Sequence, residues 1–335
     1  MKATIISEKK HFPVLLNELI SIISPLYGGT FIDCTFGQGG YSKEILKFKN
    51  NKVIAFDRDI GVKKYAEKLK KKFPNKFIFK NIRFGSLNKD VIDNKDIKAI
   101  IFDLGLSSLQ IHDYKRGISF KSQSKLNMKM GLNNFSADDV INKMSYEDLN
   151  KIIKYFGEES KSRIISKLIV KNRNIKHLDT QGLVSIINKA KIKSSKRKIN
   201  SATKTFQGIR MFVNNEVSEL IYGLVNNFNI LPIGGIIAVV TFHSIEDKIV
   251  KYFFKHYSER NSYSRYIPDK EEKKLLFKLI NKKPIYPSLE EIKINPSSRS
   301  AKLRCAMKVG HNDDFTNFFD KFRFYLNLEK LSNKL

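Results

Sequence analysis

The sequence predicts an α/β protein with a doubly wound, mostly parallel sheet that is interrupted by an all-α insert. Between residues 31 and 103, short apolar runs that end in a carboxylate or a turn alternate with polar or helical stretches. After about Tyr114 the apolar spacing becomes helical, and an apolar run at 236–242 then resumes the strand pattern. Such alternation predicts a parallel sheet whose ligand lies at the carboxyl ends of the strands.

The first half supplies four of the expected strands. We predict strands at 31–36, 52–57, 76–81 and 98–103, with helices near 42–48 and 61–73. The loop after the first strand contains Gly37, Gly39 and Gly40, and glycine lets a backbone pass close to a ligand. By itself this loop suits NAD, FAD or S-adenosylmethionine, although it lacks the third glycine or alanine that pyrophosphate cofactors favour.

The middle of the chain is expected to be helical. Ser136 and Ser145 each precede an aspartate by three residues, which is the spacing of helix N-caps. The stretch from 189 to 204 carries basic residues and no acid: Lys189, Lys191, Lys193, Lys196, Arg197, Lys198 and Lys204. Such a run is either a solvated linker or a track for a phosphate backbone, and the sequence leaves both open.

The last third returns to the sheet. From Thr205 we expect one long amphipathic helix, then the strand at 236–242, a helix from Ser244 and a last strand near 302–309. Ser244 and Asp247 have the spacing of a capping box for that helix. The predicted domains are therefore a sheet domain in two parts, 1–114 and 205–335, and a helical insert at 115–204.

Composition narrows the class of protein. With 62 Lys and Arg against 33 Asp and Glu, the net charge is +29, which indicates a polyanionic partner such as nucleic acid, although an AT-rich genome would explain part of the lysine excess. The two cysteines show no metal-binding or disulfide spacing, which fits a reducing cytoplasm and predicts no metal. No apolar run is long enough for a membrane-spanning helix.

Two aspartates at strand ends are candidate ligand-binding residues. Asp57 ends the second strand, where an acidic side chain can accept both ribose hydroxyls of an adenosine moiety, although a helix N-cap is the plain alternative. Asp103 ends the fourth strand at the same edge of the predicted sheet. An NAD-dependent oxidoreductase would use the same devices, but it leaves the positive charge unexplained.

Several long motifs carry a resemblance to a known family. They are HFPVLLNE (11–18), DCTFGQGGYS (33–42), DLGLSSLQIHDYKRGISF (103–120), YFGEESKSRIISKLI (155–169), TKTFQGIRMFVNNEVSEL (203–220), GGIIAVVTFHSIEDKIVKYFF (234–254) and NPSSRSAKLR (295–304). In this order they resemble the bacterial 16S ribosomal RNA cytosine-N4 methyltransferases that act on the decoding centre of the small ribosomal subunit. The resemblance implies a Rossmann-like, S-adenosylmethionine-dependent methyltransferase sheet with an inserted helical substrate-recognition domain.

The resemblance also implies site residues. Those expected to bind S-adenosylmethionine are Gly39, Gly40, Tyr41, Asp57, Phe84, Asp103 and Gln110. Asp103, Ser107, Ser108 and His243 are candidates for contact with the reacting groups, although both serines could cap a turn and His243 could be an ordinary turn residue. Candidate contacts to 16S ribosomal RNA are Arg116, Lys196, Arg197, Lys198, Arg299, Lys302 and Arg304.

The chain departs from the family pattern at three places. Tyr41 stands where relatives usually have His, Asn127 and Gly131 replace two carboxylates, and one basic residue is missing from NPSSRSAKLR. The loop around Asn127 is therefore given no catalytic role. The lost carboxylates also leave open a non-catalytic assembly factor that binds the small subunit without transferring a methyl group. The oligomeric state is not determined by the sequence.

Overall fold

A computed structural model of the protein describes residues 13–88, 90–92, 96–191, 200–259, 275–312 and 314–335. In these ranges seven strands form one sheet: β1 (Gly29–Asp33), β2 (Asn51–Phe56), β3 (Phe77–Lys80), β4 (Ile97–Asp103), β5 (Ile236–Thr241), β6 (Phe277–Leu279) and β7 (Lys302–Lys308). The helices are α1 (Leu16–Ile23), α2 (Gly40–Ile45), α3 (Lys63–Lys72), α4 (Ser108–His112), α5 (Ala137–Lys143), α6 (Tyr146–Tyr155), α7 (Ser162–Arg173), α8 (Thr180–Ala190), α9 (Thr203–Asn214), α10 (Glu216–Ile230), α11 (Ser244–His256), α12 (Leu289–Ile294) and α13 (Thr316–Glu329).

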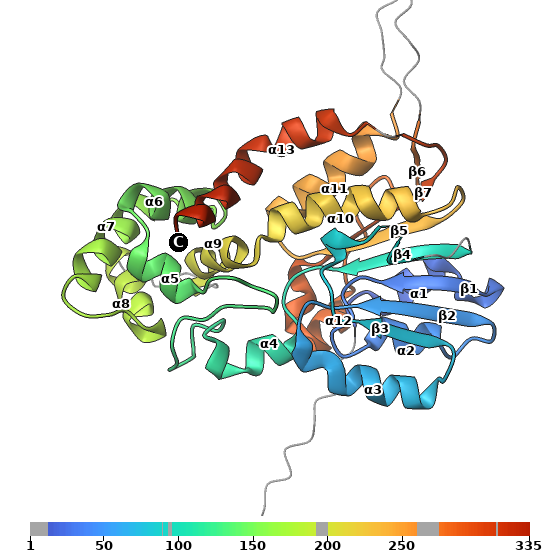
Figure 1. Ribbon diagram of the computed structural model, residues 1–335, viewed down its shortest axis with the longest axis horizontal. Coiled ribbons are helices and arrows are strands. Elements are labelled where there is room, and N and C mark those ends of the chain that lie inside the picture. Colours follow the sequence, from blue (N-terminus) through green and yellow to red (C-terminus); the bar gives the residue numbers. More distant parts are fainter. Residues whose placement is uncertain (1–12, 89, 93–95, 192–199, 260–274, 313) are drawn as a thin grey trace, which may run out of the picture.

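The sheet has the strand order β3-β2-β1-β4-β5-β7-β6 (Figure 1). The five strands from β3 to β5 pair in parallel, and β7 pairs antiparallel with both β5 and β6. The order reverses between β1 and β4, and in such sheets ligands bind beside the carboxyl ends of the strands at that point. The predicted α/β fold is confirmed, and β6 is a short strand that the sequence pattern did not predict.

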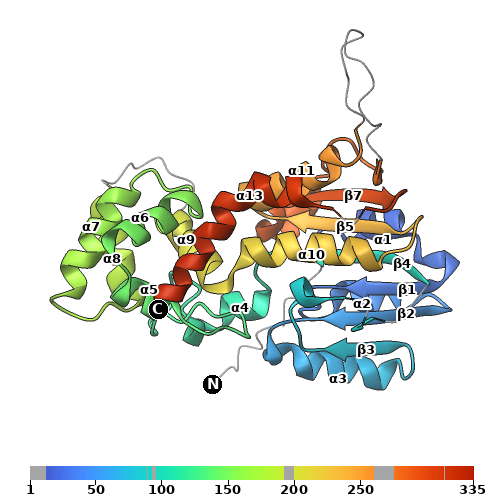
Figure 2. The ribbon, with the colours of Figure 1, turned by 45° about the horizontal axis from the view of Figure 1, so that its top comes forward.

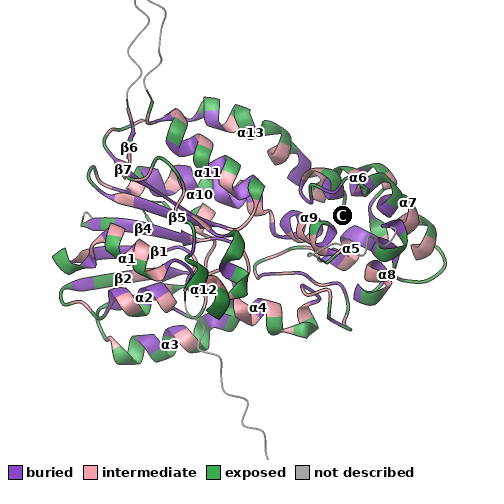
Figure 3. Ribbon diagram, turned by 180° about the vertical axis from the view of Figure 1, so that it is seen from behind, coloured by how far each residue is buried: buried purple, intermediate pink, exposed green. Residues whose placement is uncertain are grey.

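Helices cover both faces of the sheet, and alternate strand residues pack on opposite sides. Phe31, Ala99 and Ile101 pack with α1, α2 and α3 in one core cluster. Ile32, Ile100 and Phe102 pack with α10, α11 and α13 in the other cluster. Figure 3 shows the strands buried between these two layers. A sheet that is buried on both faces explains why its strands read as continuous apolar runs.

The helices α5–α9 form a lobe beside the carboxyl ends of the strands (Figures 1 and 2). Ser136 and Ser145 cap α5 and α6, as predicted. Helix α13 runs along α10 and reaches this lobe (Figure 2), where its Phe324 packs on Tyr155 with ring centroids 4.6 Å apart. Beyond the helix, Lys334 pairs with Asp148 at 2.8 Å. Because α13 contacts both parts of the molecule, the C-terminal segment joins the lobe to the sheet.

The single long helix that we expected from Thr205 is wrong. The chain forms two helices, α9 and α10, which meet at Asn215, whose φ of 50° is left-handed and stops the first helix. The side chain of Asn214 accepts from the amide of Met130 at 2.8 Å and donates to the carbonyl of Met128 at 2.9 Å. Helix α9 packs on α5 and α6 and so belongs to the helical lobe. The predicted insert, by contrast, ends at residue 204.

Candidate functional site

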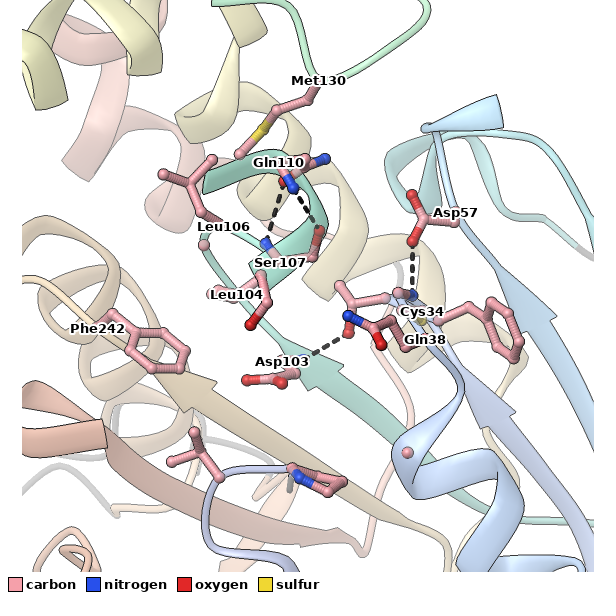
Figure 4. Close-up of a pocket in the computed structure, with 18 of the residues that line it drawn as sticks. Cys34, Gln38, Asp57, Asp103, Leu104, Leu106, Ser107, Gln110, Met130 and Phe242 are labelled. Atoms are coloured by element: carbon pink, nitrogen blue, oxygen red, sulfur yellow. Dashed lines mark hydrogen bonds between the residues drawn. The ribbon is translucent and has the colours of Figure 1, made fainter. Parts of the chain in front are cut away.

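A cavity of about 300 Å³ lies at the carboxyl ends of the strands (Figure 4). Its wall includes the loop after β1, Asp57 after β2, Asp103 at the end of β4 and Phe242 after β5. Leu104, Leu106 and Met130 add apolar surface. The predicted cofactor residues all line this cavity: Gly39, Gly40, Tyr41, Asp57, Phe84, Asp103 and Gln110.

The loop after β1 is held by packing and by buried hydrogen bonds. Gly39 has a φ of +75°, and a Cβ built there would lie 2.7 Å from the ring of Phe36. The same construction at Gly40 meets Pro13 at 2.2 Å. The hydroxyl of Tyr41 donates to the carbonyl of Val14, so this tyrosine anchors the N-terminal segment. The two glycines are therefore required by close backbone packing as well as by any ligand.

Asp57 holds the loop in position through backbone amides. One carboxylate oxygen accepts from the amide of Gly37 at 2.8 Å, and the other accepts from the amide of Asp59 at 2.8 Å. Burial raises the pKa of Asp57 to about 6. The side chain that caps the following turn is Asp59, which accepts from Gly61 at 2.9 Å. Asp57 is therefore not the helix N-cap, and its carboxylate faces the cavity (Figure 4).

Phe84 and the segment that begins at Ser107 form the next part of the wall. Phe84 packs edge to face on Phe102, with ring centroids 5.3 Å apart, and also borders the cavity. Ser107 caps α4 in a capping box with Gln110, and the Gln110 amide donates to Asp59 at 3.1 Å. Ser107 and Ser108 both line the cavity, but the hydroxyl of Ser107 is already engaged in capping α4.

Arg116, a predicted RNA contact, is paired with two carboxylates in this structure. Its guanidinium donates to both oxygens of Asp59, at 2.6 and 3.1 Å, and to Asp113 at 3.0 Å. Charge-assisted bidentate pairing of this kind fixes the guanidinium in one orientation. Arg116 therefore braces the loop beside Gln110, and its contact with RNA stays a prediction.

Asp103 is the least satisfied carboxylate of the cavity. Its backbone amide donates to the hydroxyl of Thr35 at 2.7 Å, but its Oδ1 is buried with no hydrogen-bond partner among the described residues. Burial, reinforced by the charges of Asp33 and Glu246, raises the pKa of Asp103 to about 8. A buried acceptor without a partner is costly, and such groups cluster at functional sites. Figure 4 shows Asp103 between Phe242 on one side and Asp57 on the other.

The expected capping box of Ser244 and Asp247 is wrong, because it lies one residue earlier. His243 is the N-cap of α11: its Nδ1 accepts from the amide of Glu246 at 3.4 Å, and the Glu246 carboxylate accepts from the amide of His243 at 3.3 Å. Asp247 instead pairs with Lys302 at 2.9 Å and with Arg304 at 2.7 Å. His243 is not among the described residues that line the cavity, whereas Glu246 is.

One group of side chains has spacing that could hold a metal ion. Glu216, His243 and Glu246 bring one ligand atom each within 4.8 Å of one another. Both oxygens of Glu216, however, accept from Arg210, at 2.8 and 2.9 Å. The guanidinium charge already balances this carboxylate and would repel a cation. We therefore assign the group to ion pairing.

The remaining predicted RNA contacts have different outcomes. Arg299 is exposed. Lys302 and Arg304 are both engaged with Asp247, and Arg304 is buried, so neither side chain is free, whereas we expected both to be available for RNA. Lys196, Arg197 and Lys198 lie outside the described residues. The sequence interpretation missed Glu216, Glu219, Phe242 and Glu246 as cavity residues. For Glu246 the sequence did offer a signal, because this acid lies three residues after His243, which is the spacing of a capping box.

The comparisons with known proteins agree with this arrangement. The family model described as the MraW methylase family matches residues 8–309. The chain belongs to this family. Curated relatives named Ribosomal RNA small subunit methyltransferase H include proteins from Rickettsia bellii and Ehrlichia chaffeensis, each 41% identical to this chain. The alignments cover 90% and 89% of this chain, respectively, and 100% of each relative.

As a member of this family the chain is a methyltransferase whose methyl donor is S-adenosylmethionine. The alternative hypothesis of an NAD-dependent oxidoreductase is therefore rejected. A solved rRNA methylase from Streptococcus thermophilus aligns with 90% of this chain and 99% of its own, at 10% identity and a TM-score of 0.36, which is too distant to bear on the site. None of the described helices is long and apolar enough to cross a membrane.

Proposed function

We propose that this protein transfers a methyl group from S-adenosylmethionine to the exocyclic N4 amine of one cytosine in the decoding centre of 16S ribosomal RNA. The curated relatives are named for methylation of small-subunit ribosomal RNA, which supports the substrate class. The net charge of +29 supports a polyanionic substrate. We also propose that it acts in the cytoplasm.

The observation that carries the proposal is the buried Oδ1 of Asp103 in the wall of the cavity, for which the described part of the chain provides no hydrogen-bond donor. An exocyclic amine of cytosine is a poor nucleophile because its lone pair is delocalised into the ring. A carboxylate that accepts a hydrogen bond from this amine localises the lone pair on nitrogen and can then take the proton. Asp103 offers the amine a buried acceptor that none of the described residues uses.

The chain also offers groups that would hold the methyl donor. The Asp57 carboxylate suits the ribose hydroxyls, and Phe84 and the loop of Gly39 and Gly40 border the same part of the cavity. When bound, S-adenosylmethionine supplies an electrophilic methyl group on a positively charged sulfur. That charge favours the ionised form of Asp103. The contributions of the protein are then orientation of the amine, exclusion of water and acceptance of a proton.

Methylation at C5 of cytosine would need a different residue. That reaction requires a cysteine thiolate to attack C6 of the base. Burial raises the pKa of Cys34 well above its ordinary value, and its thiol lies 3.6 Å from the amide oxygen of Asn227. Cys305 is buried in β7, and burial raises its pKa as well. Both thiols are therefore held in their unreactive form, which supports reaction at N4.

The test is mass spectrometry of nucleosides from small-subunit RNA of cells with and without the gene. We expect an N4-methylated cytidine to disappear when the gene is deleted and to return with the parental gene. A non-catalytic assembly factor would leave every methylated nucleoside in place while still binding the small subunit. Loss of a methylated nucleoside other than N4-methylated cytidine would contradict the proposed target.

A further inference from the structure

A further carboxylate, that of Glu246, lines the cavity next to Phe242. Glu246 lies in the first turn of α11, and 7% of its side chain is exposed. It lines the cavity together with Phe242, Leu104 and Leu106. Figure 4 shows Phe242 on the opposite side of Asp103 from Asp57. If Asp57 marks the ribose of the donor, the apolar wall around Phe242 marks the place of the acceptor base.

Glu246 is held rigidly by groups that favour its charged form. One oxygen accepts from the amides of Phe242 at 2.8 Å and His243 at 3.3 Å, and the other lies 3.1 Å from Nε2 of His243. The imidazole Nδ1 accepts from the amide of Glu246, while Nε2 makes no hydrogen bond of normal geometry with the described residues despite its closeness to the carboxylate. The N-terminus of α11 adds a favourable helix dipole.

The pKa values of Asp103 and Glu246, two of the carboxyl groups in the cavity wall, are shifted in opposite directions. Burial alone would raise the pKa of Glu246, but His243, the amide of Phe242 and Arg210 together outweigh burial and lower it. The pKa of Asp103 is raised instead, because Asp103 is buried and faces the charges of Asp33 and Glu246. Paired acids whose environments separate their pKa values commonly divide the roles of charge and proton transfer.

We propose that Glu246 is a second catalytic carboxylate, which faces the acceptor base and stabilises the positive charge that develops on the amine nitrogen. The inference rests on the proposed function. As the nitrogen–carbon bond forms, the carbon–sulfur bond breaks and sulfur keeps the bonding pair, so that positive charge moves to nitrogen. The nitrogen then loses a proton to the carboxylate of Asp103. A fixed negative charge on the acceptor side therefore interacts more strongly with the transition state than with the ground state.

His243 acts through Glu246 and is therefore a positioning residue. It caps α11, lies 3.1 Å from the Glu246 carboxylate and is not among the described residues that line the cavity. Arg210 and Glu216 extend the same ion-pair group from α9 and the start of α10. This arrangement assigns no proton shuttle to the imidazole.

The test compares Glu246→Gln with the parent in single-turnover methyl transfer at saturating donor and RNA, between pH 5.5 and 9. Glutamine keeps the size of the side chain and removes its charge. We expect the rate on the plateau to fall about 100-fold, the scale of losing one preorganised electrostatic contact. The rise of the rate with pH should also occur at lower pH than in the parent, because the pKa of Asp103 falls when the charge of Glu246 is removed. Asp33 and Tyr41 also interact with Asp103, and Glu246→Gln leaves both of these residues unchanged.

A second readout uses the protein without donor. Titration of the Asp103 carboxyl by NMR should give a lower pKa in Glu246→Gln than in the parent, because one of the two charges that raise it is gone. The matched control is Glu329→Gln. Glu329 is also buried and accepts from two backbone amides at a helix N-terminus, at 2.9 and 3.0 Å, but it is not among the described cavity residues. This control should leave the rate and the Asp103 titration unchanged.

If Glu246→Gln does not fold, His243→Asn replaces it, since asparagine can still cap α11. The loss of rate should then grow as the pH falls, because Glu246 without the imidazole takes up a proton more readily. If a folded Glu246→Gln or His243→Asn variant kept the plateau rate and the pH profile of the parent, the inference would be overturned. A product other than N4-methylated cytidine from the parent would instead contradict the proposed function, whatever Glu246 contributes to the rate.

Discussion

The substitution Asp103→Asn is expected to make the protein more stable and less active. Asparagine has nearly the same shape as aspartate and carries no charge, so it removes the cost of a buried carboxylate. The pKa of Asp103 is raised from 3.8 to about 8. A carboxyl group with a raised pKa keeps its proton in the folded chain while the unfolded chain releases it. Stability is therefore lost as the pH rises from about 4 toward 8.

The size of this effect follows from the pH interval. Between pH 3.8 and pH 7 the parent loses up to about 4 kcal/mol of folding free energy through Asp103 alone, at about 1.4 kcal/mol per pH unit. Relaxation around the buried group makes that figure an upper bound, so we expect Asp103→Asn to gain roughly 1–3 kcal/mol at pH 7. The gain should vanish near pH 4 and level off above pH 8.

The assay is denaturant unfolding of parent and variant without donor at pH 4.5, 7 and 8.5. Single-turnover methyl transfer at saturating donor should fall at least about 100-fold in the same variant. A stability difference that does not change with pH would refute the assigned burial of the Asp103 carboxylate. A parental transfer rate would leave Asp103 as a binding residue and remove its role in accepting the proton.

Three further outcomes are expected. Asp57→Ala should weaken binding of S-adenosylmethionine by roughly 1–3 kcal/mol in calorimetry, because hydrogen-bonding partners lose their acceptor, while RNA affinity stays the same. Reversing the charges of Lys196, Arg197 and Lys198 should lower RNA affinity and flatten its salt dependence, whereas an unchanged slope would identify a solvated linker. Gly105→Ala should slow methyl transfer, because φ at Gly105 is +97° and the new Cβ would lie 3.3 Å from Phe242; crystallography of the variant would show whether the ring moves.

The sequence determined the features whose physical causes are local. Apolar runs predicted six of the seven strands, since most of these runs are buried in the interior of the sheet. The caps at Ser136 and Ser145 could be predicted because a cap depends on residues three positions apart. The predicted cofactor residues line one cavity because the carboxyl ends of parallel strands meet at one edge.

Tertiary structure decided the features that depend on distant partners. Asn215 ends α9, and the neighbouring Asn214 is hydrogen-bonded to the segment near Met130, a contact that no local pattern reveals. Lys302 and Arg304 look like free basic residues in the sequence, yet the fold brings Asp247 against both. Glu246 differs in environment from its neighbour Asp247 because one faces the cavity and the other faces β7. The charge state and accessibility of an ionisable group are set by burial and by nearby charges, and both are fixed only when the chain is folded.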